Sequence, residues 1–147
     1  MKKYFVSLCC FALCCISIAG YCSDVNEKVL KTFKATFPNA QNVTWQTIAE
    51  RYTAQFRQNG IQTIVNYDYE GNLLSATRYY GEDNLPINLI VTLNAKYPAK
   101  KIFGVTEVST NDTIDYFIKL QDQTTWMTVK ADAEGNTEVI EKFNKQL

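Results

Sequence analysis

The stretch Tyr67-Asp68-Tyr69-Glu70-Gly71-Asn72 occurs a second time, 64 residues later, as Ala131-Asp132-Ala133-Glu134-Gly135-Asn136. Each copy ends one run of alternating apolar and polar residues and begins another, which is typical of a turn between two antiparallel strands. The glycine of each copy can supply the positive φ that a tight reversal needs. The repeated turn therefore predicts that the chain contains two copies of one structural unit.

The repetition extends on both sides of this turn. Around and after it the two copies match at a shift of 64 residues without a gap, so that Val65 corresponds to Val129. Nearer the start of each copy the shift is 60, and the four extra residues fall in a predicted hairpin at residues 108–113. Insertions collect in turns because lengthening a loop costs little free energy. We therefore divide the chain into repeat one, residues 24–84, and repeat two, residues 85–147.

Each repeat begins with a predicted amphipathic helix. In residues 24–38 apolar side chains recur along one helical face, with Asp24 placed to cap the first turn and Pro38 to end the helix. The second copy has the same pattern, with Asn84 as the cap and Pro98 at the end. The apolar positions are Val25, Val29, Leu30, Phe33 and Phe37 in repeat one and Leu85, Leu89, Ile90, Leu93 and Tyr97 in repeat two. Such a stripe is typical of a helix face that packs on a core.

Three or four short strands follow each helix. In repeat one the predicted strands, which alternate between apolar and polar side chains, are residues 43–48, 52–57, 61–67 and 73–80. Asn59-Gly60 between two of them is a strong hairpin signal. One such unit leaves an amphipathic sheet covered by a single helix, and two units can join their sheets. We therefore expect an α+β fold in which two tandem helix-plus-antiparallel-meander repeats form one sheet, with both helices on one side and the opposite face open.

Alternation also assigns side chains to the two faces of this sheet. The set expected to face the helices is Ile61, Thr63 and Val65 in repeat one and Thr125, Met127, Val129 and Ala131 in repeat two. The set expected to face outward is Gln62, Ile64 and Asn66 in repeat one and Trp126, Thr128 and Lys130 in repeat two. The last strand of each repeat is ambiguous by this test. Even so, the adjacent Tyr79 and Tyr80 must point to opposite faces, so one of them is outward.

The first 22 residues have the pattern of a secretory signal peptide, with a basic start, an uncharged apolar run from Tyr4 to Ala19 and small residues after it. The run is short for a membrane span, which needs about 20 apolar residues. All five cysteines lie in or beside this segment, and Tyr21 stands where a lipoprotein signal needs a small residue before Cys22. We expect a cleaved signal peptide, a single mature domain of residues 23–147 without a lipid or a membrane span, and a periplasmic or secreted location.

The composition of the mature domain excludes the commonest catalytic groups. The chain has no histidine, and the cysteines are expected to leave with the signal peptide. The mature domain would then lack the commonest general base, the usual zinc ligands and a thiol nucleophile. The mature domain has 13 basic and 15 acidic residues and no basic patch for nucleic acid. The acidic turns cluster oxygen donors but lack the ligand spacing of a calcium loop. We therefore expect no enzyme activity, no metal site and no cofactor.

Several short motifs follow one another along the mature chain. They are Asn42-Val43-Thr44-Trp45, Tyr52-Thr53-Ala54-Gln55-Phe56, Asn59-Gly60, the turn at 67–72, and a helix followed by Tyr97-Pro98. This combination resembles the exported PepSY-like proteins of bacteria, which are also described as β-lactamase-inhibitor-like proteins. The resemblance covers nearly all of the mature chain and implies tandem helix-plus-meander units, a periplasmic or surface location and a non-catalytic binding role. Repeat two departs from the pattern, with Val105 for Trp45 and Gln123-Thr124 for Asn59-Gly60, so the two units are not expected to bind identically.

The outward aromatic residues are the best candidates for a binding site, since Trp and Tyr supply most hot spots at protein interfaces. The candidate residues are Trp126, Tyr80, Tyr79, Tyr69 and Ile64. Packing of Trp126 against a neighbouring strand or loop is the competing interpretation. We expect a non-enzymatic protein that engages another protein through the open sheet face, for example to inhibit an exported enzyme. The alternatives are a carrier of a small molecule or cell-envelope ligand, and a calcium-dependent adhesion or scaffold element. The sequence identifies neither the partner nor the oligomeric state.

Overall fold

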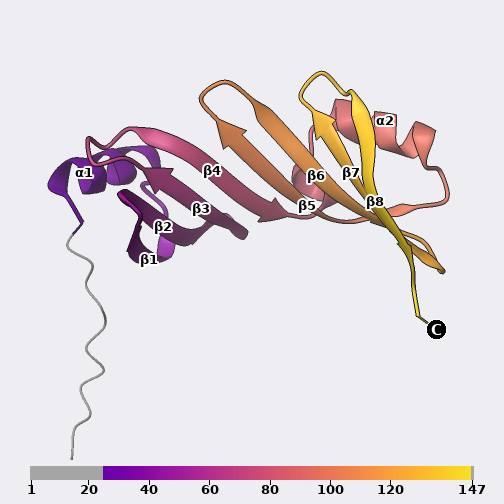
Figure 1. The fold of residues 1–147 in the computed structure, drawn as a ribbon, viewed down its shortest axis with the longest axis horizontal. Coiled ribbons are helices and arrows are strands. Elements are labelled where there is room, and N and C mark those ends of the chain that lie inside the picture. Colours follow the sequence, from indigo (N-terminus) through magenta and orange to yellow (C-terminus); the bar gives the residue numbers. More distant parts are fainter. Residues whose placement is uncertain (1–24, 147) are drawn as a thin grey trace, which may run out of the picture.

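The computed structural model describes residues 25–146. Eight strands form one open antiparallel sheet, in which they follow chain order from β1 to β8 (Figure 1). Two α-helices pack on this sheet. Repeat one contributes α1 (Glu27–Thr36), β1 (Gln41–Ile48), β2 (Arg51–Gln58), β3 (Ile61–Tyr67) and β4 (Leu73–Tyr80). Repeat two contributes α2 (Ile87–Lys96), β5 (Lys101–Thr110), β6 (Ile114–Gln121), β7 (Thr125–Asp132) and β8 (Thr137–Asn144), after the short 3-10 helix η1 (Glu82–Asn84). The expected α+β fold is confirmed.

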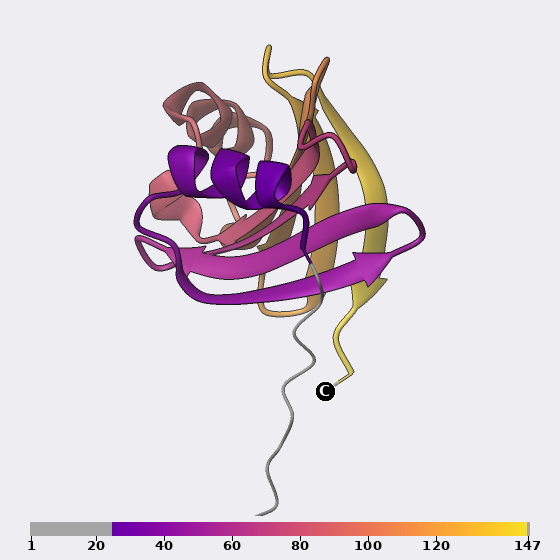
Figure 2. The same cartoon turned by 90° about the vertical axis from the view of Figure 1, so that its left-hand side faces the viewer.

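Both helices cover the same face of the twisted sheet (Figure 2). Buried side chains form two adjoining clusters, one beneath each helix. Helix α1 buries Val29 and Phe33 in the first cluster, and α2 buries Leu89 and Leu93 in the second. The two clusters share one side of β4, because Ala76 belongs to the first cluster while Tyr80, four residues on, packs against the second.

The first helix is capped later than its sequence suggests. The side chain of Asn26 accepts a hydrogen bond of 2.9 Å from the backbone N–H of Lys28 and caps α1. The cap expected at Asp24 lies outside the described residues. The end is as expected, because α1 stops before Phe37, the residue that precedes Pro38.

The cap expected at Asn84 for the second helix is wrong. Asn84 belongs to η1, and α2 begins after Pro86. The carbonyl of Pro86 accepts the N–H groups of Leu89 and Ile90 at 3.0 and 3.2 Å. Proline suits this place because it lacks an N–H and its ring fixes φ near the helical value.

The repeated turn is built by its aspartate. The Asp68 carboxylate accepts hydrogen bonds from the backbone N–H and the side-chain amide of Asn72, both at 2.8 Å. Asp132 and Asn136 repeat this arrangement at 2.8 and 2.7 Å. These bonds lower the pKa of both aspartates. The Asp and Asn of the motif, which suggested a calcium loop, thus have a structural role in closing the turn.

Each repeated turn also fastens a helix to the sheet. The side-chain amide of Asn26 donates to the carbonyl of Tyr69 at 3.2 Å, and Asn88 donates to the carbonyl of Ala133 at the same distance. In repeat one an ion pair of 2.7 Å between Lys28 and Glu70 adds to this contact. The turn therefore fixes the start of each helix over the end of the third strand.

Candidate functional site

The open face of repeat one is mainly polar and carries a ladder of side-chain hydrogen bonds. On neighbouring strands the Thr53 hydroxyl donates to Asn66 Oδ1 at 2.8 Å, and Asn66 Nδ2 donates to the Ser75 hydroxyl at 3.0 Å. These three residues pair directly across β2, β3 and β4. Such a ladder stabilises the sheet and occupies these three side chains.

The open face of repeat two, together with the adjoining end of β4 from repeat one, carries five aromatic rings. We call them the aromatic patch: Tyr79 at the end of β4, Phe103 on β5, Phe117 on β6, Trp126 on β7 and Phe143 on β8. Phe103 is 60% exposed, and Tyr79 and Phe143 are each 43% exposed. Isolated exposed rings are common on proteins, whereas neighbouring ones on one face mark an interaction site.

Trp126 occupies the outward register expected for it, in pairing with Gln121 and Phe143. Its ring is nevertheless partly buried. The ring of Phe103 meets it edge-on with 4.8 Å between centroids, and the ammonium of Lys145 lies 4.6 Å from its centroid. Lys145 is held there by hydrogen bonds to Gln121 Oε1 and the carbonyl of Asp122. Trp126 is thus an outward residue that also packs within its own sheet.

Of the two adjacent tyrosines, only Tyr79 faces outward. Tyr79 pairs with Thr106 on the open face, whereas Tyr80 pairs with the buried Val105 on the helix side. There the Tyr80 hydroxyl donates to the Glu107 carboxylate at 2.5 Å, and Arg78 contacts the same carboxylate at 3.1 Å. Burial and this hydrogen bond raise the pKa of Tyr80 well above its usual range. Tyr80 is therefore wrong as an open-face candidate, since its side chain completes the junction between the two repeats.

The remaining two candidates lie apart from the aromatic patch. Tyr69 is 43% exposed in the turn after β3, on the helix side, where its ring packs edge-on against Tyr52 at 5.1 Å. It cannot share a contact surface with Trp126. Ile64 does face outward, as expected, but it pairs with Gln55 and Thr77 among the polar residues of repeat one. Only Tyr79 and Trp126 of the sequence candidates belong to the patch.

Three members of the patch were not singled out from the sequence. Phe117 could have been found, because it lies between the inward-facing Tyr116 and Ile118. Phe143 could have been found from its match to Tyr79 in the repeat. Phe103 had no signal of its own, since a bulge between Ile102 and Gly104 breaks the alternation of β5.

The two repeats serve as controls for each other at the patch. Phe117 corresponds to Thr53, and Trp126 corresponds to Gln62. Repeat one forms the same strands in the same order with these polar residues. The fold therefore does not require an aromatic residue at either position.

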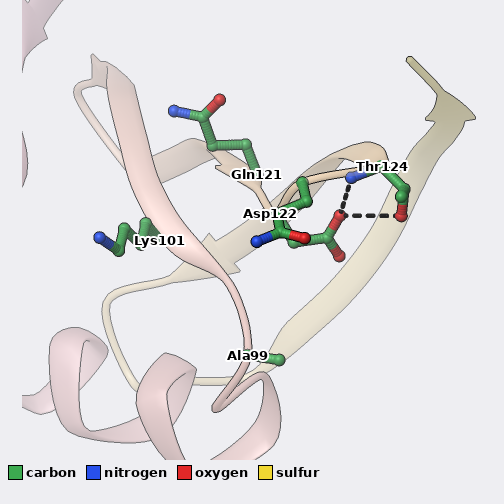
Figure 3. Close-up of a pocket in the computed structure, with 6 residues that line it drawn as sticks. Ala99, Lys101, Gln121, Asp122 and Thr124 are labelled. Carbon is green, nitrogen blue, oxygen red and sulfur yellow. Dashed lines mark hydrogen bonds between the residues drawn. The ribbon is translucent and has the colours of Figure 1, made fainter. Parts of the chain in front are cut away.

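A separate recess of about 640 Å³ lies beside the β6–β7 turn (Figure 3). It is lined by Ala99, Lys101, Gln121, Asp122, Gln123 and Thr124. The Asp122 carboxylate accepts the backbone N–H groups of Thr124 and Thr125 at 2.9 and 2.7 Å and pairs with Lys100 at 2.5 Å. The Lys100 contact and the hydrogen bonds of the turn lower the pKa of Asp122 strongly. The carboxylate of Asp122 is thus already used to hold the turn.

The described part of the chain contains neither a cluster of potential metal ligands nor a membrane-crossing helix. Within residues 25–146 no three His, Cys, Asp or Glu side chains gather as a potential metal site. Neither α1 nor α2 has the length and apolar character of a membrane-crossing helix, and the same holds for η1.

Comparison with known proteins identifies the fold. No protein-family model and no curated protein matches the chain. Solved structures do match: a DUF2874 family protein from Bacteroides uniformis has 21% identity and a TM-score of 0.59, covering 81% of this chain and 88% of its own. A candidate periplasmic protein from Bacteroides eggerthii has 19% identity and a TM-score of 0.61, covering 85% and 90%. A BLIP-like protein from Bacteroides fragilis has 15% identity and a TM-score of 0.61, covering 81% and 85%.

These likenesses are low in sequence and concern the fold alone. The BLIP-like neighbour agrees with the β-lactamase-inhibitor-like half of the resemblance seen in the sequence. None of the three proteins is named as PepSY-like, so that half has no support from them. One neighbour is named for the periplasm, the location expected here from the N-terminal segment.

Proposed function

We propose that this chain is an exported, non-enzymatic protein that binds another protein through the aromatic patch. The observation that carries the proposal is the difference between the repeats. Phe117 and Trp126 lie where repeat one has Thr53 and Gln62, so folding does not account for them. Large rings on a rigid sheet are the usual anchors of protein interfaces.

The surroundings of the patch support a protein as the partner. The patch spreads over five strands from β4 to β8, with three of its rings at least 43% exposed. Polar and charged side chains lie among the rings, among them Lys119, Thr128 and Glu141. An apolar centre with a polar border is the common composition of protein interfaces. Inhibition of an exported enzyme is one form such binding could take, in keeping with the BLIP-like name of one structural neighbour.

The alternative of a small-molecule carrier receives less support. A carrier site should be an enclosed, mainly apolar cavity with a few polar groups. The recess beside the β6–β7 turn is instead lined by Lys101, Gln121 and Asp122 with other mostly polar residues.

The test exchanges residues between the repeats. The exported protein is immobilised, and proteins captured from the native cell envelope are identified and purified for affinity measurement. The variant Phe117→Thr/Trp126→Gln should bind the captured partner about 30-fold or more weakly, as loss of hot-spot residues does. The matched control Thr53→Ala/Gln62→Ala changes the same positions of repeat one and should keep the affinity. Equal affinities of the first variant and the unchanged protein would contradict the proposal.

A further inference from the structure

A strand residue without a side chain lies at the centre of the aromatic patch. Gly104 on β5 pairs with Lys119 on the open face. Its φ is not in the left-handed region, and an added Cβ would meet only the carbonyl oxygen of Tyr80, at 4.0 Å. Neither the backbone nor close packing therefore requires glycine, although glycine weakens a strand. In repeat one the corresponding residue is Thr44.

The missing side chain leaves a groove in the open face. The groove has a volume of about 400 Å³, and Gly104, Tyr79, Phe103, Phe117, Lys119 and Thr128 are among the residues that line it. Aromatic rings thus form much of its walls, and Gly104 contributes to its floor. A glycine inside a strand often marks a place where another group approaches the backbone closely.

Lys119 gives this groove a charge. Its ammonium lies 5.9 Å from the centroid of the Trp126 ring, and the residue is partly buried. Among residues 25–146 it makes no ion pair, whereas the neighbouring Lys130 pairs with Asp115 at 3.0 Å. In the row of the sheet that contains Lys119, the next residue is Thr128 and the one after it is Glu141. The Glu141 carboxylate accepts a hydrogen bond from the Thr128 hydroxyl at 3.4 Å. The corresponding residue of repeat one is the neutral Gln55.

An ammonium group that makes no ion pair can form a charge-assisted hydrogen bond with an anionic partner. Apolar walls around it favour a ligand that combines a carboxylate with apolar groups. Protein loops offer this combination when Asp or Glu stands next to a large apolar residue.

We propose that the groove over Gly104 receives an acidic side chain from a loop of the protein partner, with Lys119 as its counter-ion. The neighbouring apolar side chain of that loop packs between Phe103 and Phe117. This inference rests on the proposed function, because it names the chemistry of the partner at the same face. Repeat one lacks both parts of the site, the gap and the cation.

The test uses two blocked dipeptides that differ only in charge, acetyl-Asp-Leu-amide and acetyl-Asn-Leu-amide. Backbone amide shifts of the isotope-labelled exported protein report where and how tightly each binds. The Asp peptide should bind about fivefold to tenfold more tightly at low salt, with shifts centred on β5 and β6, since a charge-assisted contact is worth about that factor. Lys119→Gln should remove the preference. Equal affinities of the two peptides or shifts elsewhere would overturn the inference. So would the absence of shifts at about 20 mM peptide, a concentration that corresponds to a binding free energy of only about 2 kcal/mol.

A second pair of variants tests the gap itself. Gly104→Thr installs the residue of repeat one and should abolish binding of both peptides without loss of the fold, because its Cβ has room. Gly81→Ala is the matched control, since a Cβ there meets nothing within 4 Å, and it should bind as the unchanged protein does. Unchanged peptide binding by Gly104→Thr would show that the groove is not the site.

Failure of this inference can be told from failure of the proposed function. If Gly104→Thr and Lys119→Gln keep full affinity for the captured partner while Phe117→Thr/Trp126→Gln loses it, the patch stands and the acidic anchor is wrong. If all of these variants keep their affinity, both proposals are wrong.

Discussion

Replacement of Trp126 by glutamine should weaken the fold measurably while leaving it intact. The exchange removes an edge-on contact with Phe103 at 4.8 Å, worth about 0.5–1.5 kcal/mol. It also removes the contact of Lys145 with the ring at 4.6 Å, worth about 0.5–1 kcal/mol at a partly exposed site. The expected loss of unfolding free energy is therefore about 1–2.5 kcal/mol. Glutamine is tolerated by the strand, since Gln62 holds the same position in repeat one.

The measurement is urea unfolding followed by circular dichroism. With a slope of about 2 kcal/mol per molar urea, the midpoint should fall by about 0.5–1.2 M. Phe103→Ala and the double variant complete a cycle that isolates the ring contact, whose coupling energy should be about 0.5–1.5 kcal/mol. A loss above about 4 kcal/mol would place Trp126 among core residues, and a coupling near zero would show that the two rings do not stabilise each other.

Three further predictions concern the core, the turns and export. Phe33→Ala and Leu93→Ala should each cost about 2–5 kcal/mol in urea unfolding, because both side chains are at most 5% exposed, and a loss below 1 kcal/mol for either (roughly the cost of a surface change) would contradict the core assignment. The pKa of Asp122 is lowered in the folded state, so its carboxylate stabilises the fold above the unfolded pKa near 4 and this contribution is lost as the pH falls. Asp122→Asn should accordingly lower stability at pH 7 and make it less sensitive to acid, and an unchanged acid dependence would refute the linkage. Mass spectrometry of the exported protein should find a chain that begins at Ser23, or at Tyr21 if the cut follows Gly20, without a lipid, whereas an intact N-terminus or a lipid on Cys22 would disprove this.

The sequence predicts the fold because the same local rules apply twice. Alternation on β3 and β7 assigns Val65 and Val129 to the core and Ile64 and Trp126 to the open face, and the burial of these strands agrees. Period 2 is a reliable signal where one face of a sheet is covered and the other is not. The helix starts were less predictable, since Asn84 and Pro86 are both acceptable near a first turn and only the path of η1 decides between them.

The site was predictable only in part, because it depends on irregular features. Tyr79 and Tyr80 are indistinguishable by residue type, and only the register of β4 against its neighbours, Tyr79 with Gln62 on β3 and with Thr106 on β5, shows which one is outward. An irregularity in the β3–β4 pairing between Asn66 and Tyr67 interrupts the simple alternation before this point. Phe103 reaches the patch through a bulge, which a sequence pattern does not reveal. Lys145 comes directly after β8, and its side chain reaches the ring of Trp126 on the open face.

Comparison of the two repeats extends to the helix side of the molecule. Helix α1 presents Glu27 and Lys31 to solvent, and the corresponding residues of α2 are Ile87 and Val91, which are 74% and 62% exposed. A charged outer face is therefore sufficient for a helix at this position. Repeat two thus departs from repeat one on both of its faces, and on each face some polar residues of repeat one are replaced by apolar ones. Because both repeats fold into the same sheet, these differences cannot be explained by the needs of the fold, and they are the positions where exchange between the repeats separates structure from function.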